Sequence, residues 1–278
     1  MKTPKYLTKG SKIALVAPGN KIVRNDITAA VKWIEEKGFF PVYDDRLFAE
    51  YYRFAGDDEL RRSVLQEYLD REDIDAILCA RGGYGTIRII DKLDFTKFEK
   101  YPKWIIGYSD VTVLHAKMQQ LGYKSIYGTM PINFEKNTKE ALESLFNALI
   151  GKWNIEINKN SLQSFDDLKI VGGNLSVLYS LLGSDLFPET DGKILFIEEI
   201  NEYLYHIDRM MMGLKRAGKL AKLKALLVGA FTNINDSAVP FGMNYKEIIF
   251  EKVKEYGYPV IYDYPNGHID DNHAIILG

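Results

Sequence analysis

Short apolar runs alternate with segments of helical periodicity along the first half of the chain. Residues 12–16 form the first run, apolar positions recur at helical spacing over residues 27–34, and residues 41–43 form the next run. Runs of this length that are rich in β-branched residues are typical of strands. Strands that alternate with helices usually pair in parallel, so the pattern predicts βαβ units at the start of the chain.

The same alternation continues toward the middle of the chain. A charged segment with helical spacing covers residues 57–72, and apolar runs follow at residues 74–79 and 104–107. A further helical pattern begins just after the second of these runs. We therefore expect residues 1–150 to form an N-terminal α/β domain, with a mostly parallel sheet and flanking helices.

Polar residues interrupt this pattern after position 150. Residues 151–169 carry several Asn and Ser and show no hydrophobic period, which predicts a linker. Beyond it, residues 170–278 return to alternating strands and helices and are expected to form a C-terminal α/β domain. Its expected strands are residues 193–197, 225–228 and 259–262, and its expected helices lie before residue 183, around residues 207–214 and near residues 245–256.

Composition narrows the class of protein. The chain has 278 residues, 46% of them hydrophobic, which is enough for the cores of two domains. Its formal net charge of −2 gives no overall field that would attract nucleic acid or an anionic membrane. The single cysteine, Cys79, excludes an intramolecular disulfide and a zinc site built on several cysteines. The sequence shows no signal peptide and no apolar run long enough to span a membrane, so we expect a cytoplasmic protein.

The most informative stretch runs from Trp104 to His115. Its apolar run reaches Ser109 at a turn introduced by Gly107 and passes directly into a helical pattern. This order is typical of the elbow that lifts a nucleophilic serine out of a sheet. The G-x-S-x-G pattern is incomplete, because Val111 stands in place of the second glycine. Ser109 is therefore interpreted either as a nucleophile or as the N-cap of the following helix.

A glycine-rich loop, residues 81–85, follows the strand expected at residues 74–79. Glycines in such a loop let backbone amides approach an anion closely. A phosphate loop would need a Lys and a Ser or Thr that the sequence does not place there. Two other interpretations are a tight turn and an oxyanion hole, in which the amide of Gly82 or Gly83 works with that of Asp110.

A serine nucleophile needs a base, and the chain has four histidines. His115 lies six positions after Ser109, nearly two helical turns away, so we expect it to fill the core or the surface. His206 falls in a helical segment that is equally compatible with an exposed face, and His273 lies close to the end of the sequence. His268 follows an expected strand on a turn, where catalytic groups are usually found, and is the preferred base.

The third group of a catalytic triad is a carboxylate that orients the imidazole. The candidates Glu198, Glu199 and Glu202 end or follow the apolar run at residues 193–197. Adjacent strand residues point to opposite faces, so Glu198 and Glu199 cannot flank one bond as a glycosidase pair. The sequence has no ligand spacing typical of a metal site, and we expect neither a metal nor a cofactor.

Six blocks of sequence follow one another in a characteristic order. They are residues 10–18, 80–85, 106–115, 172–175, 194–199 together with 205–210, and 267–268. In this order they resemble the LD-carboxypeptidase family of serine peptidases, which includes microcin C immunity-type hydrolases. The resemblance covers nearly the whole chain. It departs from the family after His268, because residues 274–278 lack the family's proline although Asn272 is present.

The resemblance implies a two-domain α/β fold with the active site between the domains. The family's site residues fall here on Ser109, Glu198 and His268 for the triad, and on the backbone near Gly82, Gly83 and Asp110 for the oxyanion hole. Glu198 is preferred to Glu199 because the family's acid ends the apolar strand. Relatives continue beyond position 278, which implies that closing strands of the second domain are missing.

The function implied by the resemblance is that of a serine carboxypeptidase. It would remove the terminal D-alanine of a cytoplasmic muropeptide tetrapeptide by cleaving an L,D peptide bond, for cell-wall recycling. A homodimer is implied, with a small peptide as substrate and no nucleic acid or membrane as partner. Two alternatives stay open: an immunity-type hydrolase of peptidyl or aminoacyl nucleotide analogues, and an inactive binding protein of the same fold.

Overall fold

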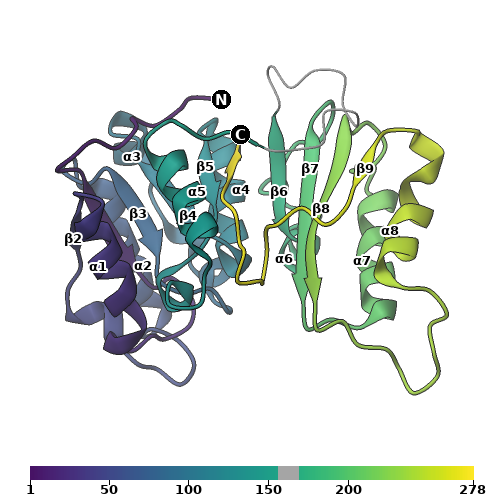
Figure 1. The fold of residues 1–278 in the computed structure, drawn as a ribbon, viewed down its shortest axis with the longest axis horizontal. Helices are drawn as coiled ribbons and strands as arrows, with labels where there is room; N and C mark the ends of the chain where they lie inside the picture. The colour runs from purple at the N-terminus through teal and green to yellow at the C-terminus, as the bar shows by residue number, and fades with distance from the viewer. Residues whose placement is uncertain (156–168) are drawn as a thin grey trace.

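A computed structural model describes residues 1–155 and 169–278. The chain forms two units that stand side by side, each built on its own β-sheet (Figure 1). One sheet has six strands and the other has four. The two ends of the chain lie close together, at the junction of the two units. The predicted α/β class is confirmed.

The first sheet has the strand order β10-β5-β4-β3-β1-β2. Its strands are β1 (Lys12–Val16), β2 (Phe40–Val42), β3 (Ala76–Cys79), β4 (Trp104–Gly107), β5 (Ser125–Tyr127) and β10 (Ile275–Leu277). All pairs are parallel except that of β10 with β5. Parallel strands end at the same edge, so the segments that follow β1, β3, β4 and β5 meet there.

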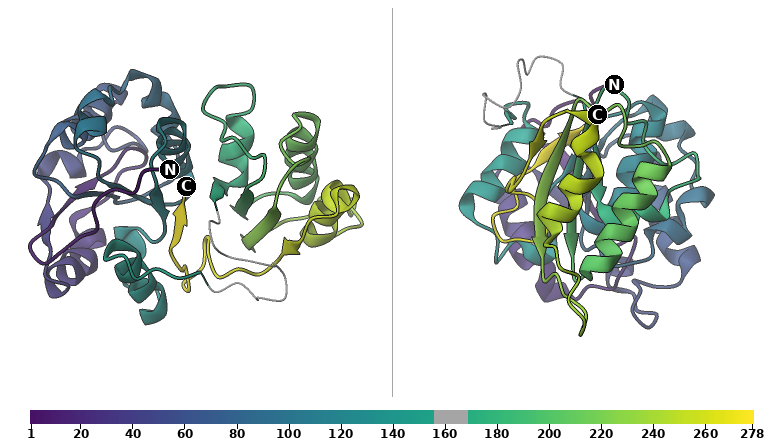
Figure 2. Two further views of the ribbon diagram at one scale, coloured as in Figure 1. Left: turned by 90° about the horizontal axis from the view of Figure 1, so that it is seen from above. Right: turned by 90° about the vertical axis from the view of Figure 1, so that its right-hand side faces the viewer.

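Helices cover both faces of the first sheet (Figure 2). One face is covered by α1 (Thr28–Glu36) and α5 (Lys139–Leu149), and the other by α2 (Asp58–Asp70), α3 (Thr96–Lys100) and α4 (Thr112–Leu121). Side chains mark two of the starts: Asp57 accepts from the N–H of Leu60, and Thr138 from that of Ala141. Burial on both faces explains why these strands are continuous apolar runs.

The second sheet is fully parallel, in the order β6-β7-β8-β9. Its strands are β6 (Ile170–Asn174), β7 (Ile194–Ile200), β8 (Ala225–Thr232) and β9 (Val260–Ile261). Helices α6 (Leu175–Ser180), α7 (Leu204–Arg216) and α8 (Tyr245–Val253) pack on one of its faces (Figure 2).

The other face of the second sheet packs into the core of the first unit. Phe196 on β7 belongs to the same buried cluster as Val113 and Tyr127 of the first unit. Gly173 on β6 has a φ of 146°, and a side chain there would come within 2.6 Å of the hydroxyl oxygen of Thr112. Glycine tolerates both the conformation and the close approach. A continuous apolar core therefore fixes the two units against each other.

The end of the chain returns to the first unit. β10 falls within residues 170–278, the expected second domain, yet it pairs with β5 of the first sheet. The N–H of Gly278 donates to the carbonyl of Ile170 at 2.8 Å, so this strand also touches the second unit. Residues 156–168 of the linker expected at 151–169 lie outside the described residues. The expected domain boundaries stay a prediction.

Candidate active site

Ser109 stands on a tight turn between β4 and α4. β4 ends at Gly107, and Ser109 opens a short helical turn that leads into α4. Its φ of 63° is a left-handed conformation, which costs a residue with a side chain about 1–3 kcal/mol. A side chain at Gly107 would come within 2.9 Å of that of Val111, so glycine fits two residues before the serine. These are the features of a strand-to-helix elbow that presents a nucleophile.

The alternative interpretation of Ser109 as a helix N-cap does not match this geometry. The cap positions of the short helical turn and of α4 are Tyr108 and Val111, and neither side chain makes a cap hydrogen bond. Ser109 lies inside the turn instead, half-buried at the carboxyl end of β4. The elbow is therefore the better description of its position.

Glu198 and His268 come together from positions 70 residues apart in the sequence. Glu198 is a fully buried residue of β7, and His268 lies in the connection between β9 and β10. The Nδ1 atom of His268 and the Oε2 atom of Glu198 are 2.7 Å apart. The ring of Tyr108 packs edge-on against the imidazole, with the ring centroids 4.9 Å apart. The carboxylate and the tyrosine together hold the imidazole in one orientation.

Opposing effects act on the pKa of His268. Burial lowers this pKa, while the charge of Glu198 and the hydrogen bond to its carboxylate raise it. The carboxylate outweighs burial, so the pKa of His268 lies above its ordinary value of 6.5. With Nδ1 held by Glu198, Nε2 is the ring nitrogen left to exchange a proton.

One hydroxyl connects the serine to the acid. Tyr127, at the end of β5, accepts a hydrogen bond from the backbone N–H of Ser109 at 3.0 Å and donates one to Oε1 of Glu198 at 2.8 Å. Among the described residues, no hydrogen bond joins Ser109 directly to His268. The structure thus links the three expected triad residues in one network, in which Glu198 is the shared member.

Different hydrogen-bond partners separate the roles of Glu198 and Glu199. The register of β7 against β8 shifts between Ile197 and Glu199. The extra residue at this irregularity lies on β8, and the pairing of β7 with β6 stays regular as far as Glu198. Both accept from the side-chain amide of Asn174, at 3.2 Å for Glu198 and 3.0 Å for Glu199. The carboxylate that reaches His268 is that of Glu198.

Glu199 is bound to the backbone instead. Its carboxylate accepts hydrogen bonds from the N–H groups of Ser176, at 2.7 Å, and Ile200, at 2.8 Å. Burial and the neighbouring charge of Glu198 raise the pKa of Glu199 to about 7. Ser176 lies in the first turn of α6, so Glu199 anchors the start of that helix.

The glycine-rich loop lies against Ser109. A side chain at Gly82 would be 3.3 Å from Oγ of Ser109 and 3.4 Å from the backbone nitrogen of Asp110. Gly83 has a φ of 97° and faces Asn20, whose side chain occupies the place of a Cβ there. Asp110 lies in the first helical turn after the elbow, where backbone N–H groups lack partners within the helix. Of the two glycines, Gly82 is therefore the one in contact with the serine.

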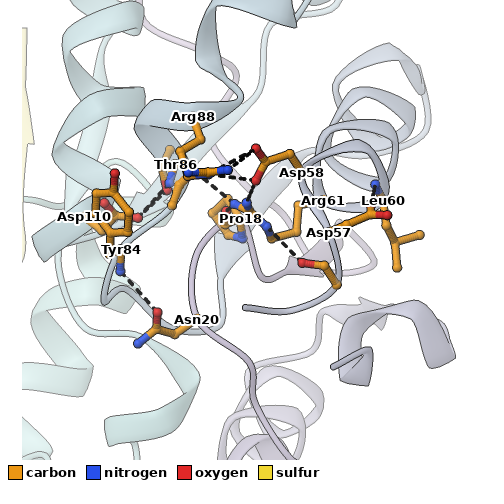
Figure 3. Close-up of polar contacts among 12 residues, drawn as sticks. Pro18, Asn20, Asp57, Asp58, Leu60, Arg61, Tyr84, Thr86, Arg88 and Asp110 are labelled. Atoms are coloured by element: carbon orange, nitrogen blue, oxygen red, sulfur yellow. Dashed lines mark hydrogen bonds and ion pairs between the residues drawn. The ribbon is translucent and has the colours of Figure 1, made fainter. Parts of the chain in front are cut away.

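Hydrogen bonds from buried side chains hold the glycine-rich loop in place (Figure 3). The carboxylate of Asp110 accepts from the N–H of Thr86 at 2.9 Å and from its hydroxyl at 2.7 Å. The guanidinium of Arg61, a residue only 2% exposed, donates to the carbonyls of Pro18 and Gly85. These contacts tie together the segments that follow β1, β3 and β4.

His115 is a core residue, one of the two roles expected for it. Its Nδ1 lies 2.8 Å from the hydroxyl of Ser125, and its Nε2 lies 2.8 Å from the carbonyl of Gly107. Burial lowers the pKa of His115 to about 4, so the ring is neutral at physiological pH. Its hydrogen bond to Gly107 supports the elbow from within the core.

The other two histidines pair with acids away from Ser109. Nδ1 of His206 lies 2.7 Å from Glu202, the third candidate acid, and Nε2 of His273 lies 3.0 Å from Asp271. Within residues 1–155 and 169–278, no three His, Cys, Asp or Glu side chains are grouped so that they could hold a metal ion. In the same part of the chain, no helix has the length and apolar character to cross a bilayer.

Four residues around the site have no role in the sequence-based interpretation: Tyr127, Asn174, Thr86 and Arg61. Tyr127 ends a strand of only three residues, which is too short for alternation to reveal. Thr86 and Arg61 act through partners in distant segments. The one local signal is the Gly172-Gly173-Asn174 block, in which two glycines precede a polar residue at a strand end.

Two domains of a known protein family match the two parts of this chain. Residues 13–128 match the LD-carboxypeptidase N-terminal domain, and residues 169–278 match the LD-carboxypeptidase C-terminal domain. The chain belongs to the LD-carboxypeptidase family. It is 31% identical to the probable murein peptide carboxypeptidase of Bacillus subtilis, over 99% of this chain and 89% of that protein. The predicted family membership is confirmed.

Two solved structures show the same LD-carboxypeptidase fold. The muramoyltetrapeptide carboxypeptidase from Oxalobacter formigenes superimposes with a TM-score of 0.83, at 28% identity, over 96% of this chain and 93% of its own. MccF in complex with glutamyl sulfamoyl guanosine superimposes with a TM-score of 0.87, at 22% identity, over 99% and 93%. The arrangement of two α/β units is therefore that of the family.

Proposed function

We propose that this protein is a serine carboxypeptidase that removes the terminal D-alanine of a muropeptide tetrapeptide by hydrolysing an L,D peptide bond. The observation that carries the proposal is the 2.7 Å contact between His268 and the buried carboxylate of Glu198, which Tyr127 joins to the strained turn of Ser109. A serine on an elbow and an imidazole oriented by a carboxylate are the parts that nucleophilic acyl transfer requires.

The proposed reaction passes through an acyl-enzyme. Oγ of Ser109 attacks the carbonyl carbon of the L,D bond while Nε2 of His268 takes the hydroxyl proton. The C–N bond breaks, and the imidazolium gives that proton to the amine of the departing D-alanine. A water molecule then attacks the acyl group, His268 accepts and returns a proton again, and the shortened peptide leaves with Ser109 restored. Glu198 keeps the proton on Nδ1 and stabilises each imidazolium.

Each tetrahedral intermediate carries a negative oxygen that needs hydrogen-bond donors. We assign this role to the backbone amide of Asp110 and to the loop that carries Gly82 and Gly83. The close approach of Gly82 to Ser109 and Asp110, which leaves little room for a side chain at position 82, supports the assignment. Because the loop is tied to Arg61 and Thr86, its amides need little reorganisation during the reaction.

The substrate in this proposal comes from the named relatives. The Bacillus subtilis relative is a probable murein peptide carboxypeptidase, and the Oxalobacter formigenes structure is a muramoyltetrapeptide carboxypeptidase. Both proteins match this chain over nearly its whole length. The proposal also includes cytoplasmic action in cell-wall recycling as a homodimer, and light scattering on the purified protein tests the assembly.

The similarity to MccF supports a second candidate function, hydrolysis of aminoacyl nucleotide analogues. The MccF structure contains glutamyl sulfamoyl guanosine, and at 22% identity its likeness shows a shared fold. The same Ser109, Glu198 and His268 would act on such a substrate. The intact contact of His268 with Glu198 argues against an inactive binding protein.

Incubation with defined substrates tests the proposal. The purified protein and its Ser109→Ala variant are each mixed with a tetrapeptide muropeptide, and free D-alanine and the tripeptide product are followed by mass spectrometry. Release by the unmodified protein alone supports the carboxypeptidase and its nucleophile together. Cleavage of glutamyl sulfamoyl guanosine and not of the muropeptide would favour the second candidate. No turnover of either substrate by the folded protein would favour a binding protein.

A further inference from the structure

We propose that Tyr127 is a positioning residue of this active site, whose hydroxyl holds the elbow of Ser109 in register with the Glu198 carboxylate. The inference rests on the proposed function, because it assigns Tyr127 a task within that reaction. Its starting point is geometric: one hydroxyl contacts the backbone of the nucleophile and the acid of the triad, which belong to different sheets.

The direction of both hydrogen bonds follows from chemistry. The N–H of Ser109 can only donate, and an ionised carboxylate can only accept. The Tyr127 hydroxyl therefore accepts from Ser109 at 3.0 Å and gives its one proton to Glu198 at 2.8 Å. Burial, reinforced by the charge of Glu198, raises the pKa of Tyr127 well above its ordinary value of 10, so the hydroxyl keeps this proton.

The contact with Tyr127 also limits which backbone amides can form the oxyanion hole. In many serine hydrolases, the backbone N–H of the nucleophile itself is one of the donors. Here the N–H of Ser109 is engaged by Tyr127, on the side of the acid. The amide of the next residue, Asp110, is left to serve the intermediate. Tyr127 therefore helps to decide which backbone groups face the substrate.

Packing between the two units places the Tyr127 ring. Tyr127 is completely buried, and the centroid of its ring lies 5.3 Å from the ring centroid of Phe196 on β7. A side chain at Gly173 on β6 would approach Cε2 of Tyr127 to 3.0 Å, so the glycine lets β6 lie directly against the ring. Within the described structure, Tyr127 is the residue whose side chain is hydrogen-bonded to both Ser109 and Glu198.

The pKa of His268 depends on the hydrogen bond between Tyr127 and Glu198. Glu198 contacts its Nδ1, the ring of Tyr108 packs against it, and Glu199 acts on it through charge. Loss of the Tyr127 hydroxyl removes none of these three groups, but it takes one hydrogen-bond donor from Glu198. The negative charge of the carboxylate is then less compensated by hydrogen-bond donors and stabilises the imidazolium more, so the pKa of His268 rises. A purely structural role for Tyr127 would not move this pKa.

The test compares Tyr127→Phe with Tyr123→Phe. Tyr123 is a second buried tyrosine, but its hydroxyl donates to the carbonyl of Glu99 at 3.2 Å. In Tyr127→Phe we expect kcat on the muropeptide to fall about 10–100-fold, with KM changed by less than about twofold. We expect the pKa of His268, followed by NMR, to rise by about 0.5–1 pH unit. Tyr123→Phe is expected to change neither quantity.

A second variant keeps the inference testable if loss of the hydroxyl impairs folding. 3-Fluorotyrosine incorporated at position 127 retains the hydroxyl and makes it a stronger donor, so the pKa of His268 is expected to fall instead. An unchanged His268 titration in the folded variants would overturn the inference. The titration needs no substrate, so absence of muropeptide cleavage by the unmodified protein would count against the proposed function and leave the Tyr127 test readable.

Discussion

The proposed nucleophile and the proposed acid–base pair of this site are held in place by different means. Ser109 is positioned by a strained backbone turn and by the buried contacts of Asp110 and Arg61, all within the first unit. Glu198 and His268 come from the second unit and the returning connection, and Tyr127 and Asn174 hold the carboxylate. The nucleophile depends on one unit, whereas the acid–base pair depends on packing between two.

This difference separates the expected effects of substitutions. Changes on the acid–base side alter the charge and orientation of an imidazole, so they act on the rate and its pH dependence. Changes behind the elbow remove buried polar contacts, so they act on stability as well as on the rate.

The largest effect is expected at the nucleophile itself. Ser109→Ala is expected to lower kcat/KM at least about 10⁴-fold, because no other group supplies the attacking oxygen. Its circular dichroism spectrum and melting temperature are expected to stay close to those of the unmodified protein. Ser180→Ala, at an exposed position on α6, is the control and is expected to be fully active. Substantial turnover by Ser109→Ala would remove this serine from the mechanism.

Two neighbouring carboxylates provide the next comparison. Glu198→Gln is expected to lower kcat about 10³–10⁴-fold, because an amide can no longer hold the proton on Nδ1 of His268 or balance the imidazolium. Glu199→Gln keeps the Glu198 carboxylate in contact with His268 but disturbs the backbone contacts of Ser176 and Ile200. We expect it to cost about 1–3 kcal/mol of stability and less than tenfold in kcat. Equal kinetic effects would contradict the separate roles assigned to the two acids.

Substitution of two adjacent arginines tests the buried contacts that hold the glycine-rich loop beside the elbow. Arg61→Ala leaves the carbonyls of Pro18 and Gly85 without this donor and is expected to destabilise the fold by about 3 kcal/mol. We expect kcat to fall about tenfold as the loop loosens. Arg62 pairs with Glu59 at the surface, and Arg62→Ala is expected to change stability by less than about 1 kcal/mol. Denaturant unfolding and steady-state kinetics measure both quantities.

The smallest effect is a pH dependence of the unmodified enzyme near neutrality. His268 must be neutral to accept the serine proton, so kcat/KM is expected to fall as the pH drops through its pKa. Since Glu198 raises this pKa above 6.5, we expect the midpoint of the acid limb above that value. Well below that midpoint, the loss approaches about tenfold per pH unit. A midpoint below 6.5 would contradict the dominance of the carboxylate.

Local patterns in the sequence were sufficient for much of the fold. The alternation of apolar runs with helical spacing predicted the parallel strands β1, β3 and β4 and the helices α1 and α2, whereas the short α3 between β3 and β4 was not predicted. The three-residue strands β5 and β10 were not predicted, because so short a segment carries little periodicity, although the equally short β2 and β9 were predicted from apolar runs. The pairing of β10 with β5 also joins positions about 150 residues apart, which no local pattern can show.

For the site, the sequence by itself determined the residue types and the local turn: glycine before Ser109, a strand that ends in acids, and a histidine after a strand. Only the tertiary structure decided which acid reaches His268, because that contact joins residues 70 positions apart in the sequence. It also brought Tyr127 between Ser109 and Glu198, since that contact depends on how two sheets pack. Neighbouring residues determine a local turn, whereas a contact between residues 71 positions apart forms only when the core of the protein has formed.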